Sequence, residues 1–260
     1  MSDVIVEICG DDAPVAHVIL NRVAKRNALS GGFAAEIRQA ALDLAGRDDV
    51  RAVVVESASD RAFIGGADVN DLCAVETPAE GERLIRNLQQ MIAAYRDLPM
   101  PVIAAIDGPC IGAGMEFVAA CDIRIASTRA VFGMPETKLG IPSVIEAALL
   151  PRLLGWGRTS WMLLTGGDID GATAERWGFV EFVTDPADLS ATVQKTISAL
   201  CEAAPKAVRD QKALMRQWED APIDDAIEAG VRAFAAAFKD DEPRRYLAPI
   251  RARLGKPRGQ

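Results

Sequence analysis

The segment VIAAIDGPCIGAGMEFVAACDIRIA, residues 102–126, gives the first indication of the fold class. Its apolar start, Val102–Ile106, has the pattern of a buried strand, and a glycine-bearing turn follows it. A helix is predicted from about Gly112 to Ala120, and another strand near Asp122–Ala126. This strand-turn-helix-strand order is typical of an α/β fold.

The sequence before this unit predicts further strands and a helix. Val4–Cys9 and Ala16–Leu20 flank the turn sequence GDDAP, which favours an antiparallel hairpin. Ser30 is placed to cap a helix over Gly31–Ala45. Arg51–Val55 is a β-branched run typical of a buried parallel strand.

Helices dominate the rest of the prediction. Thr77-Pro78-Ala79-Glu80 forms a capping box with proline at the first helical position, so a helix should extend to about Arg96. Helical spacing also dominates from about residue 187 onward. The helices predicted there are Leu189–Ala203, Pro205–Trp218 and Ile223–Phe238. We therefore expect a mixed core over residues 1–190 and a helical region over 191–260.

Composition narrows the class of protein. The 260 residues are 50% hydrophobic, enough to bury a large core. Acidic residues outnumber basic ones 37 to 29, and the net charge of -8 disfavours nucleic-acid and anionic-membrane partners. The five cysteines lack zinc-site spacing and disulfide density, and no long apolar stretch appears. We expect free thiols, no metal site and a cytoplasmic location.

Two glycine-containing segments can expose backbone N–H groups to a ligand. They are Phe63–Val69, which contains Gly65-Gly66-Ala67-Asp68, and Asp107–Glu116, which contains Gly112-Ala113-Gly114. Small residues permit close approach of a ligand oxygen, and a helix N-terminus adds unpaired amides. Either segment alone is more simply explained as an ordinary turn or a close packing contact. Two such amides that converge would form an oxyanion hole.

Two glutamates lie in apolar sequence near these segments. Glu116 falls in the first turn of the predicted helix, and Glu136 ends the stretch Phe132-Gly133-Met134-Pro135-Glu136. Poor solvation would raise the pKa of such a carboxyl toward the range that acid-base catalysis needs. The alternative is that Glu116 only complements the helix dipole and that Glu136 is a solvated loop residue.

The ordered set of motifs resembles the enoyl-CoA hydratase (crotonase) family over nearly the whole chain. The motifs are Leu20-Asn21-Arg22, Asn27-Ala28-Leu29-Ser30, Gly65-Gly66-Ala67-Asp68-Val69, Gly112-Ala113-Gly114-Met115-Glu116, Cys121-Asp122-Ile123-Arg124, Phe132–Glu136, Pro151–Gly155, Leu164-Thr165-Gly166 and Ala174–Val180. The resemblance implies an α/β fold made of a spiral of β-β-α units, followed by helices that mediate trimer formation, commonly with two trimers stacked into a hexamer.

The resemblance also implies an acyl-CoA substrate, with coenzyme A entering as part of that substrate and no separate cofactor. The amides of Ala67 and Ala113 would bind the thioester oxygen. Residues expected to contact the substrate or CoA are Lys25, Arg26, Ala28, Gly65, Gly66, Asp68, Val69 and Gly112. Lys25 and Arg26 would lie near the nucleotide end, where their charge suits phosphate.

Presence of both glutamates implies water addition to a 2-enoyl-CoA, because the family's double-bond isomerases often keep only the residue matching Glu136. Glu116 would deprotonate water and Glu136 would protonate the α-carbon. Isomerase and thioester hydrolase activities remain alternatives, because an oxyanion hole serves each reaction. A catalytically silent binding relative is a further alternative.

Two departures from the family pattern affect the expected acyl pocket. Gly140–Ala148 replaces a stretch that is often glycine-rich, so bulkier groups should restrict the acyl group to a short or specialised one. Ala113 replaces a frequent glycine but keeps its amide. Glu146 is an extra acid in this region, for which an exposed helical position is expected.

Other catalytic classes have weaker support. His17, the single histidine, lacks the partners of a Ser-His-Asp triad. A dinucleotide-binding domain would use Gly112-Ala113-Gly114 after the strand Val102–Ile106, but Phe117 stands where the third glycine belongs.

Overall fold

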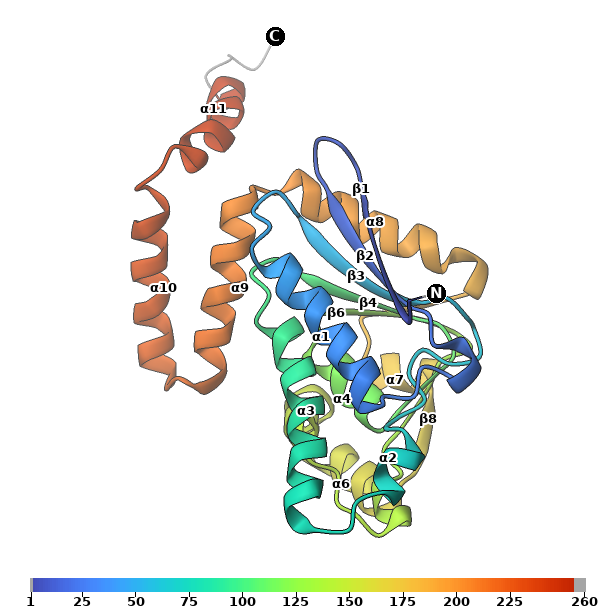
Figure 1. Ribbon diagram of the computed structural model, residues 1–260. Helices are drawn as coiled ribbons and strands as arrows, with labels where there is room; N and C mark the ends of the chain where they lie inside the picture. Colours follow the sequence, from blue (N-terminus) through green and yellow to red (C-terminus); the bar gives the residue numbers. More distant parts are fainter. Residues whose placement is uncertain (1, 255–260) are drawn as a thin grey trace. The chain divides into compact units, whose positions relative to one another are not determined.

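The computed structural model describes residues 2–254, and the chain forms two compact units, Met1–Ile197 and Ser198–Gln260 (Figure 1). The first unit holds two sheets and the helices that pack on them. The described part of the second unit is helical. None of the described helices is long and apolar enough to cross a membrane.

The main sheet has six strands in the order β1-β2-β3-β4-β6-β9. Their bounds are β1 Val4–Cys9, β2 Val15–Leu20, β3 Ala52–Ser57, β4 Val102–Ile106, β6 Ile123–Ser127 and β9 Phe182–Thr184. β1 and β2 pair antiparallel, which confirms the predicted hairpin, and every later neighbour in the sheet pairs parallel. The predicted α/β class is confirmed.

The two faces of the main sheet have different neighbours. Val53 and Val55 of β3 belong to the hydrophobic core, which also takes in buried side chains of α1 (Gly31–Ala45) and α3 (Pro78–Arg96). His17 and Glu56 point to the opposite face, where they line a polar cavity with the first half of α8 (Leu189–Glu202). The strand period of two therefore separates core residues from polar ones.

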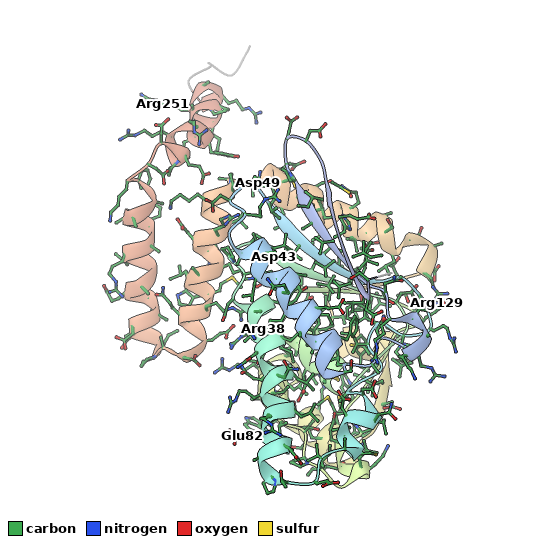
Figure 2. All side chains as sticks on the ribbon, viewed as in Figure 1. Arg38, Asp43, Asp49, Glu82, Arg129 and Arg251 are labelled. Atoms are coloured by element: carbon green, nitrogen blue, oxygen red, sulfur yellow. The ribbon has the colours of Figure 1, made fainter. Side chains whose placement is uncertain are left out.

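Helix caps fix the starts of α1 and α3. The Ser30 hydroxyl accepts a hydrogen bond from the amide of Phe33 at 3.3 Å. Thr77 and Glu80 form the full capping box, since each side chain accepts from the other residue's amide, at 3.3 and 3.0 Å. Asp43 of α1 and Glu82 of α3 are exposed, so both helices present charge to solvent (Figure 2).

A second sheet has the order β5-β7-β8, with bounds Pro109–Ile111, Val131–Gly133 and Asp168–Asp170. β5 and β7 pair parallel, and β7 and β8 pair antiparallel. The remaining elements of the first unit are short. They are η1 Val23–Lys25, α2 Val69–Cys73, α4 Ala113–Ala120, η2 Glu136–Leu139, η3 Ile145–Leu149, α5 Leu150–Leu154, α6 Trp156–Thr165, α7 Gly171–Trp177 and η4 Pro186–Asp188.

The second unit contains α9 (Pro205–Asp220), α10 (Ile223–Ala237) and α11 (Glu242–Leu254). The Glu242 carboxylate accepts hydrogen bonds from the Lys206 and Ala207 amides at 3.1 and 2.9 Å, and so caps the start of α9. The helical segments predicted over residues 191–260 are present. Their role in oligomerisation stays a prediction.

Candidate active site

One cavity of about 140 Å³ brings together the two glycine-containing segments and both glutamates. Its walls come from the loop before α2, the start of α4, the η2 region and α3. The lining residues are Gly65, Gly66, Ala67, Val69, Leu72, Leu84, Ile85, Leu88, Ile111, Gly112, Ala113, Glu116, Pro135, Glu136, Leu139, Ile141, Pro142 and Val144. Most of this wall is apolar, and Glu116 and Glu136 are its ionisable groups.

Backbone contacts hold the two glycine-containing segments side by side. Ile64 and Cys110 form a parallel bridge, and the Ile111 amide donates to the Ile64 carbonyl at 3.0 Å. Gly114, in the first turn of α4, packs directly on Ile64. A β-carbon at Gly114 would lie 2.8 Å from the Ile64 carbonyl oxygen, closer than real β-carbons approach. The glycine therefore allows α4 to start beside the other segment.

Two amides in the cavity wall differ from their neighbours in hydrogen bonding. The Asp68 amide donates to the Leu29 carbonyl at 3.0 Å, and the Gly112 amide donates to the Gly133 carbonyl at 2.8 Å. Across residues 2–254, the Ala67 and Ala113 amides have no such acceptor. Ala113 is the first residue of α4, where intrahelical partners for N–H groups are lacking. Both amides can therefore donate to a ligand oxygen.

Glu136 lies against the backbone of Gly112. Gly112 has φ 55° and ψ -122°, a conformation that favours glycine. A β-carbon there would come within 2.5 Å of Glu136 Oε1. The other carboxylate oxygen, Oε2, accepts a hydrogen bond from the Ser143 hydroxyl at 2.8 Å. Gly112 and Ser143 thus fix the position of this carboxylate next to the start of α4.

Glu116 is almost completely buried in α4, with 3% of its surface exposed. The Ala147 amide donates to its Oε1 atom at 3.3 Å. Burial raises the pKa of Glu116 to about 8, and the negative charges of Glu136 and Glu146 add to this effect, against hydrogen bonds from the Ala147 and Val144 amides. This rise in pKa favours the protonated form of Glu116 at neutral pH in the unliganded protein.

Four of the residues expected to contact the substrate lie outside this cavity. Asp68 is buried, and its carboxylate caps α2 by accepting a hydrogen bond from the Asn70 amide at 3.0 Å. The same carboxylate accepts from the Arg22 guanidinium at 3.0 Å. Burial raises the pKa of Asp68, but these hydrogen bonds outweigh it and lower the pKa overall. The Ala28 carbonyl accepts from Arg22 at 2.5 Å. Lys25 and Arg26 are exposed on a turn whose Arg26 carbonyl accepts from the Gly65 amide at 2.9 Å.

Several residues of the site were missed or misplaced by sequence reasoning. Leu84, Ile85 and Leu88 of α3 line the cavity, whereas the sequence predicted only a helix for this segment. Ser143, which binds Glu136, carried no signal of its own. The exposed helical position expected for Glu146 is wrong: only 8% of its surface is exposed, and it lies in η3.

The described residues include no group of three or more His, Cys, Asp or Glu side chains that could hold a metal ion. The cavity offers main-chain donors and two carboxyl groups as its reactive features. This set can polarise a carbonyl oxygen and move protons beside it.

Comparison with known proteins identifies the family of this chain. Residues 10–248 match the enoyl-CoA hydratase/isomerase family. The chain belongs to that family. It is 36% identical over 200 residues to the enoyl-CoA hydratase/isomerase YngF of Bacillus subtilis, with 76% of each chain covered. It is 31% identical over 232 residues to the short-chain-enoyl-CoA hydratase of Clostridium acetobutylicum, with 89% of this chain and 88% of the relative covered.

Solved structures confirm the predicted crotonase fold of this family member. An enoyl-CoA hydratase from Mycobacterium smegmatis superposes with a TM-score of 0.92 at 27% identity, covering 100% of this chain and 99% of that one. An enoyl-CoA hydratase from Bacillus anthracis gives a TM-score of 0.91 at 26% identity, with 97% of each chain covered.

Proposed function

We propose that this enoyl-CoA hydratase/isomerase family member is a hydratase that adds water across the double bond of a short 2-enoyl-CoA thioester. The observation that carries this proposal is the presence of Glu116 and Glu136 in one cavity with the unpaired amides of Ala67 and Ala113. A hydratase needs a base for water, an acid for the α-carbon and donors for the thioester oxygen. The cavity wall supplies one candidate for each role.

The proposed reaction begins with attack of a water oxygen on the β-carbon, while Glu116 accepts the proton that the water loses. The electron pair of the double bond moves toward the thioester oxygen, and the Ala67 and Ala113 amides stabilise the resulting enolate. Glu136 then gives a proton to the α-carbon. Dehydration runs through the same steps in reverse, so Glu116 then donates and Glu136 accepts.

The carboxyl pair needs one proton in total in both directions. Hydration starts with that proton on Glu136, and dehydration starts with it on Glu116, where the raised pKa favours it in the unliganded protein. Because burial and the negative charge of Glu136 disfavour ionisation of Glu116, loss of the proton from Glu116 requires a pH of about 8. The pair is thereby kept in the singly protonated form that both directions use.

The dimensions of the cavity support a short acyl group. Its volume of about 140 Å³ lies below the roughly 300 Å³ at which ordinary ligand pockets begin. Leu84 and Leu88 of α3 line it together with Leu139, Ile141 and Val144. The Clostridium acetobutylicum relative, named a short-chain-enoyl-CoA hydratase, agrees with this assignment.

Coenzyme A is proposed to enter as part of the substrate, so the reaction requires no separate cofactor. The exposed basic residues Lys25 and Arg26 lie on the turn bonded to Gly65, at the side of the cavity formed by the first glycine-containing segment. Their charge would suit the phosphates of the nucleotide end. Gly65 and Val69 would then flank the path toward the thioester.

We also propose that α10 contacts other copies of this chain in a trimer or a hexamer. Ile223, Ile227, Val231 and Phe234 recur at helical spacing and leave between 58% and 73% of their surfaces exposed. An exposed apolar stripe of this kind marks an interaction surface. Sedimentation equilibrium of the full chain would give the number of subunits.

The function is tested with a panel of 2-enoyl-CoA thioesters of increasing chain length, in which formation of the water adduct and release of CoA are followed separately. The proposal expects adduct formation that is fastest for the shortest acyl groups, with no CoA release. Release of CoA would instead indicate a thioester hydrolase. A shifted double bond without a gain in mass would indicate an isomerase. Best turnover of long chains would contradict the proposed acyl preference.

A further inference from the structure

A third acidic residue, Glu146, is buried next to the proposed catalytic pair. Its residue surface is 8% exposed, and its Oε2 atom has no hydrogen-bond partner among residues 2–254. A buried carboxylate with an unsatisfied oxygen disfavours folding. The presence of this residue is therefore not explained by packing alone.

Glu146 lies within the segment that binds Glu116. The Ala147 amide donates to Glu116 Oε1 at 3.3 Å, and the Val144 amide also acts on this carboxyl group. Ile145, between them, has φ 39°, in the left-handed region that β-branched residues rarely occupy. A strained backbone persists only where surrounding contacts hold it. Residues 144–147 therefore need an anchor.

Helix α3 provides that anchor. Burial raises the pKa of the Glu146 carboxyl group, and the charge of Asp97 adds to this rise. The charge of Arg96 and a hydrogen bond from the Gln89 side chain act in the opposite direction and favour the ionised form. η3 packs against both α3 and α4. Leu88, the neighbour of Gln89, lines the cavity. One helix thus forms part of the cavity wall and holds the segment that orients Glu116.

From this geometry we infer that Glu146 is a positioning residue: bound to α3 through Gln89, it holds residues 144–147 so that their amides orient Glu116, and its charge acts on Glu116. This inference deepens the proposed function and rests on it for its kinetic consequences. Glu146 does not line the cavity, so it should affect turnover rather than substrate binding. The charged groups that face Glu116 are Glu136 and Glu146.

The test compares two substitutions at this position. Glu146→Gln keeps a polar group for Gln89 but removes the charge, so kcat should stay close to that of the unchanged protein while the high-pH limb of kcat/KM moves to lower pH. Glu146→Ala removes the anchor, so kcat should fall at least about tenfold with KM unchanged. Glu82→Ala, at an exposed position on α3, is the control and should change neither quantity.

Gln89→Ala removes the other partner of the contact between Gln89 and Glu146, and it replaces Glu146→Ala in the test if that variant does not fold. Gln89→Ala should lower kcat with KM unchanged. Equal loss in Glu146→Gln and Glu146→Ala would overturn the anchoring role. Unchanged kcat in both Glu146→Ala and Gln89→Ala would overturn it as well.

Titration of the Glu116 carboxyl carbon by ¹³C NMR, assigned with Glu116→Gln, separates this inference from the proposed function. The pKa of Glu116 should fall in Glu146→Gln whether or not the protein hydrates enoyl-CoA. If no thioester is hydrated but this pKa falls, the proposed function fails and the inference stands. If hydration occurs and neither the pKa nor kcat responds to changes at residue 146, the inference fails alone.

Discussion

The Oε1 atom of Glu136 lies 2.5 Å from the point that a β-carbon on Gly112 would occupy. The carboxylate therefore rests directly against the backbone that precedes the unpaired Ala113 amide. This contact joins the proposed proton donor to one of the proposed oxyanion donors. It also explains why glycine is required at position 112, in addition to its φ of 55°.

Substitution of Gly112 by alanine should therefore reduce activity strongly. The new methyl group would displace Glu136 or shift the Ala113 amide, and a misplacement of about 1 Å can cost about a hundredfold in rate. Hydration of crotonyl-CoA measures this loss. Gly32→Ala is the matched control, because a β-carbon there meets nothing within 4 Å. Equal activity of the two variants would contradict the proposed role of the Gly112 contact.

Glu116→Gln and Glu136→Gln should each lower kcat for hydration by roughly a hundredfold or more, the range for a positioned acid or base. Both substitutions keep the size and polarity of the side chain, so the circular dichroism spectrum should be unchanged. Turnover like that of the unchanged protein in either variant removes that residue from the mechanism.

Ala67→Pro should abolish measurable hydration, because proline has no N–H to donate to the thioester oxygen. Ala67→Gly is the control, since it keeps the amide and should retain most activity. The two variants are compared by kcat/KM after their folding has been checked by thermal melting. A folded Ala67→Pro protein with normal turnover would show that this amide is not an oxyanion donor.

The pH dependence of kcat/KM should be the same for hydration and dehydration, with a fall above about pH 8. The pair must carry one proton in either direction, and Glu116 holds it with a pKa of about 8. The overall reaction neither takes up nor releases a proton, so the ratio of the two kcat/KM values cannot change with pH. Rates measured in both directions from pH 6 to pH 10 check this expectation; a continued rise above pH 8 would contradict it.

Folding stability should respond to the same carboxyl group. The folded-state pKa of Glu116 lies above its ordinary value of 4.5. The stabilisation that this group gives to the folded state is therefore complete below about pH 4.5 and is lost as pH rises to about 8. Glu116→Gln has no such group. The free energy of unfolding of Glu116→Gln should therefore rise relative to that of the unchanged protein as the pH increases from 4.5 to 8. The expected rise is on the order of a few kcal/mol. Denaturant titrations at several pH values measure the difference, and a constant difference would contradict the raised pKa.

Local sequence rules predicted much of the fold. Ser30 and the Thr77–Glu80 box act through residues three positions away, so their caps are visible in the sequence. The hairpin at residues 4–20 follows from turn chemistry and strand alternation. The placement of Gly112 and Glu116 beside Glu136 was expected from the family resemblance, and the structure shows these residues in one cavity.

The rest depends on contacts between distant residues, which no local pattern encodes. Glu146 looked like an exposed helical residue, but the left-handed conformation of Ile145 turns the backbone and buries it. Asp68 looked like part of the substrate path, yet Arg22, 46 positions earlier, binds its carboxylate. In hindsight, the run Asp68-Val69-Asn70-Asp71 carried the signal of a helix N-cap.

The arrangement of the thioester is tested most directly by a crystal structure of the protein with a saturated short-chain acyl-CoA such as butyryl-CoA, which cannot be hydrated. The thioester oxygen should lie about 3 Å from the amide nitrogens of both Ala67 and Ala113. The carboxyl groups of Glu116 and Glu136 should then face the α- and β-carbons. A thioester oxygen bound to other atoms, with the acyl chain outside this cavity, would contradict the account.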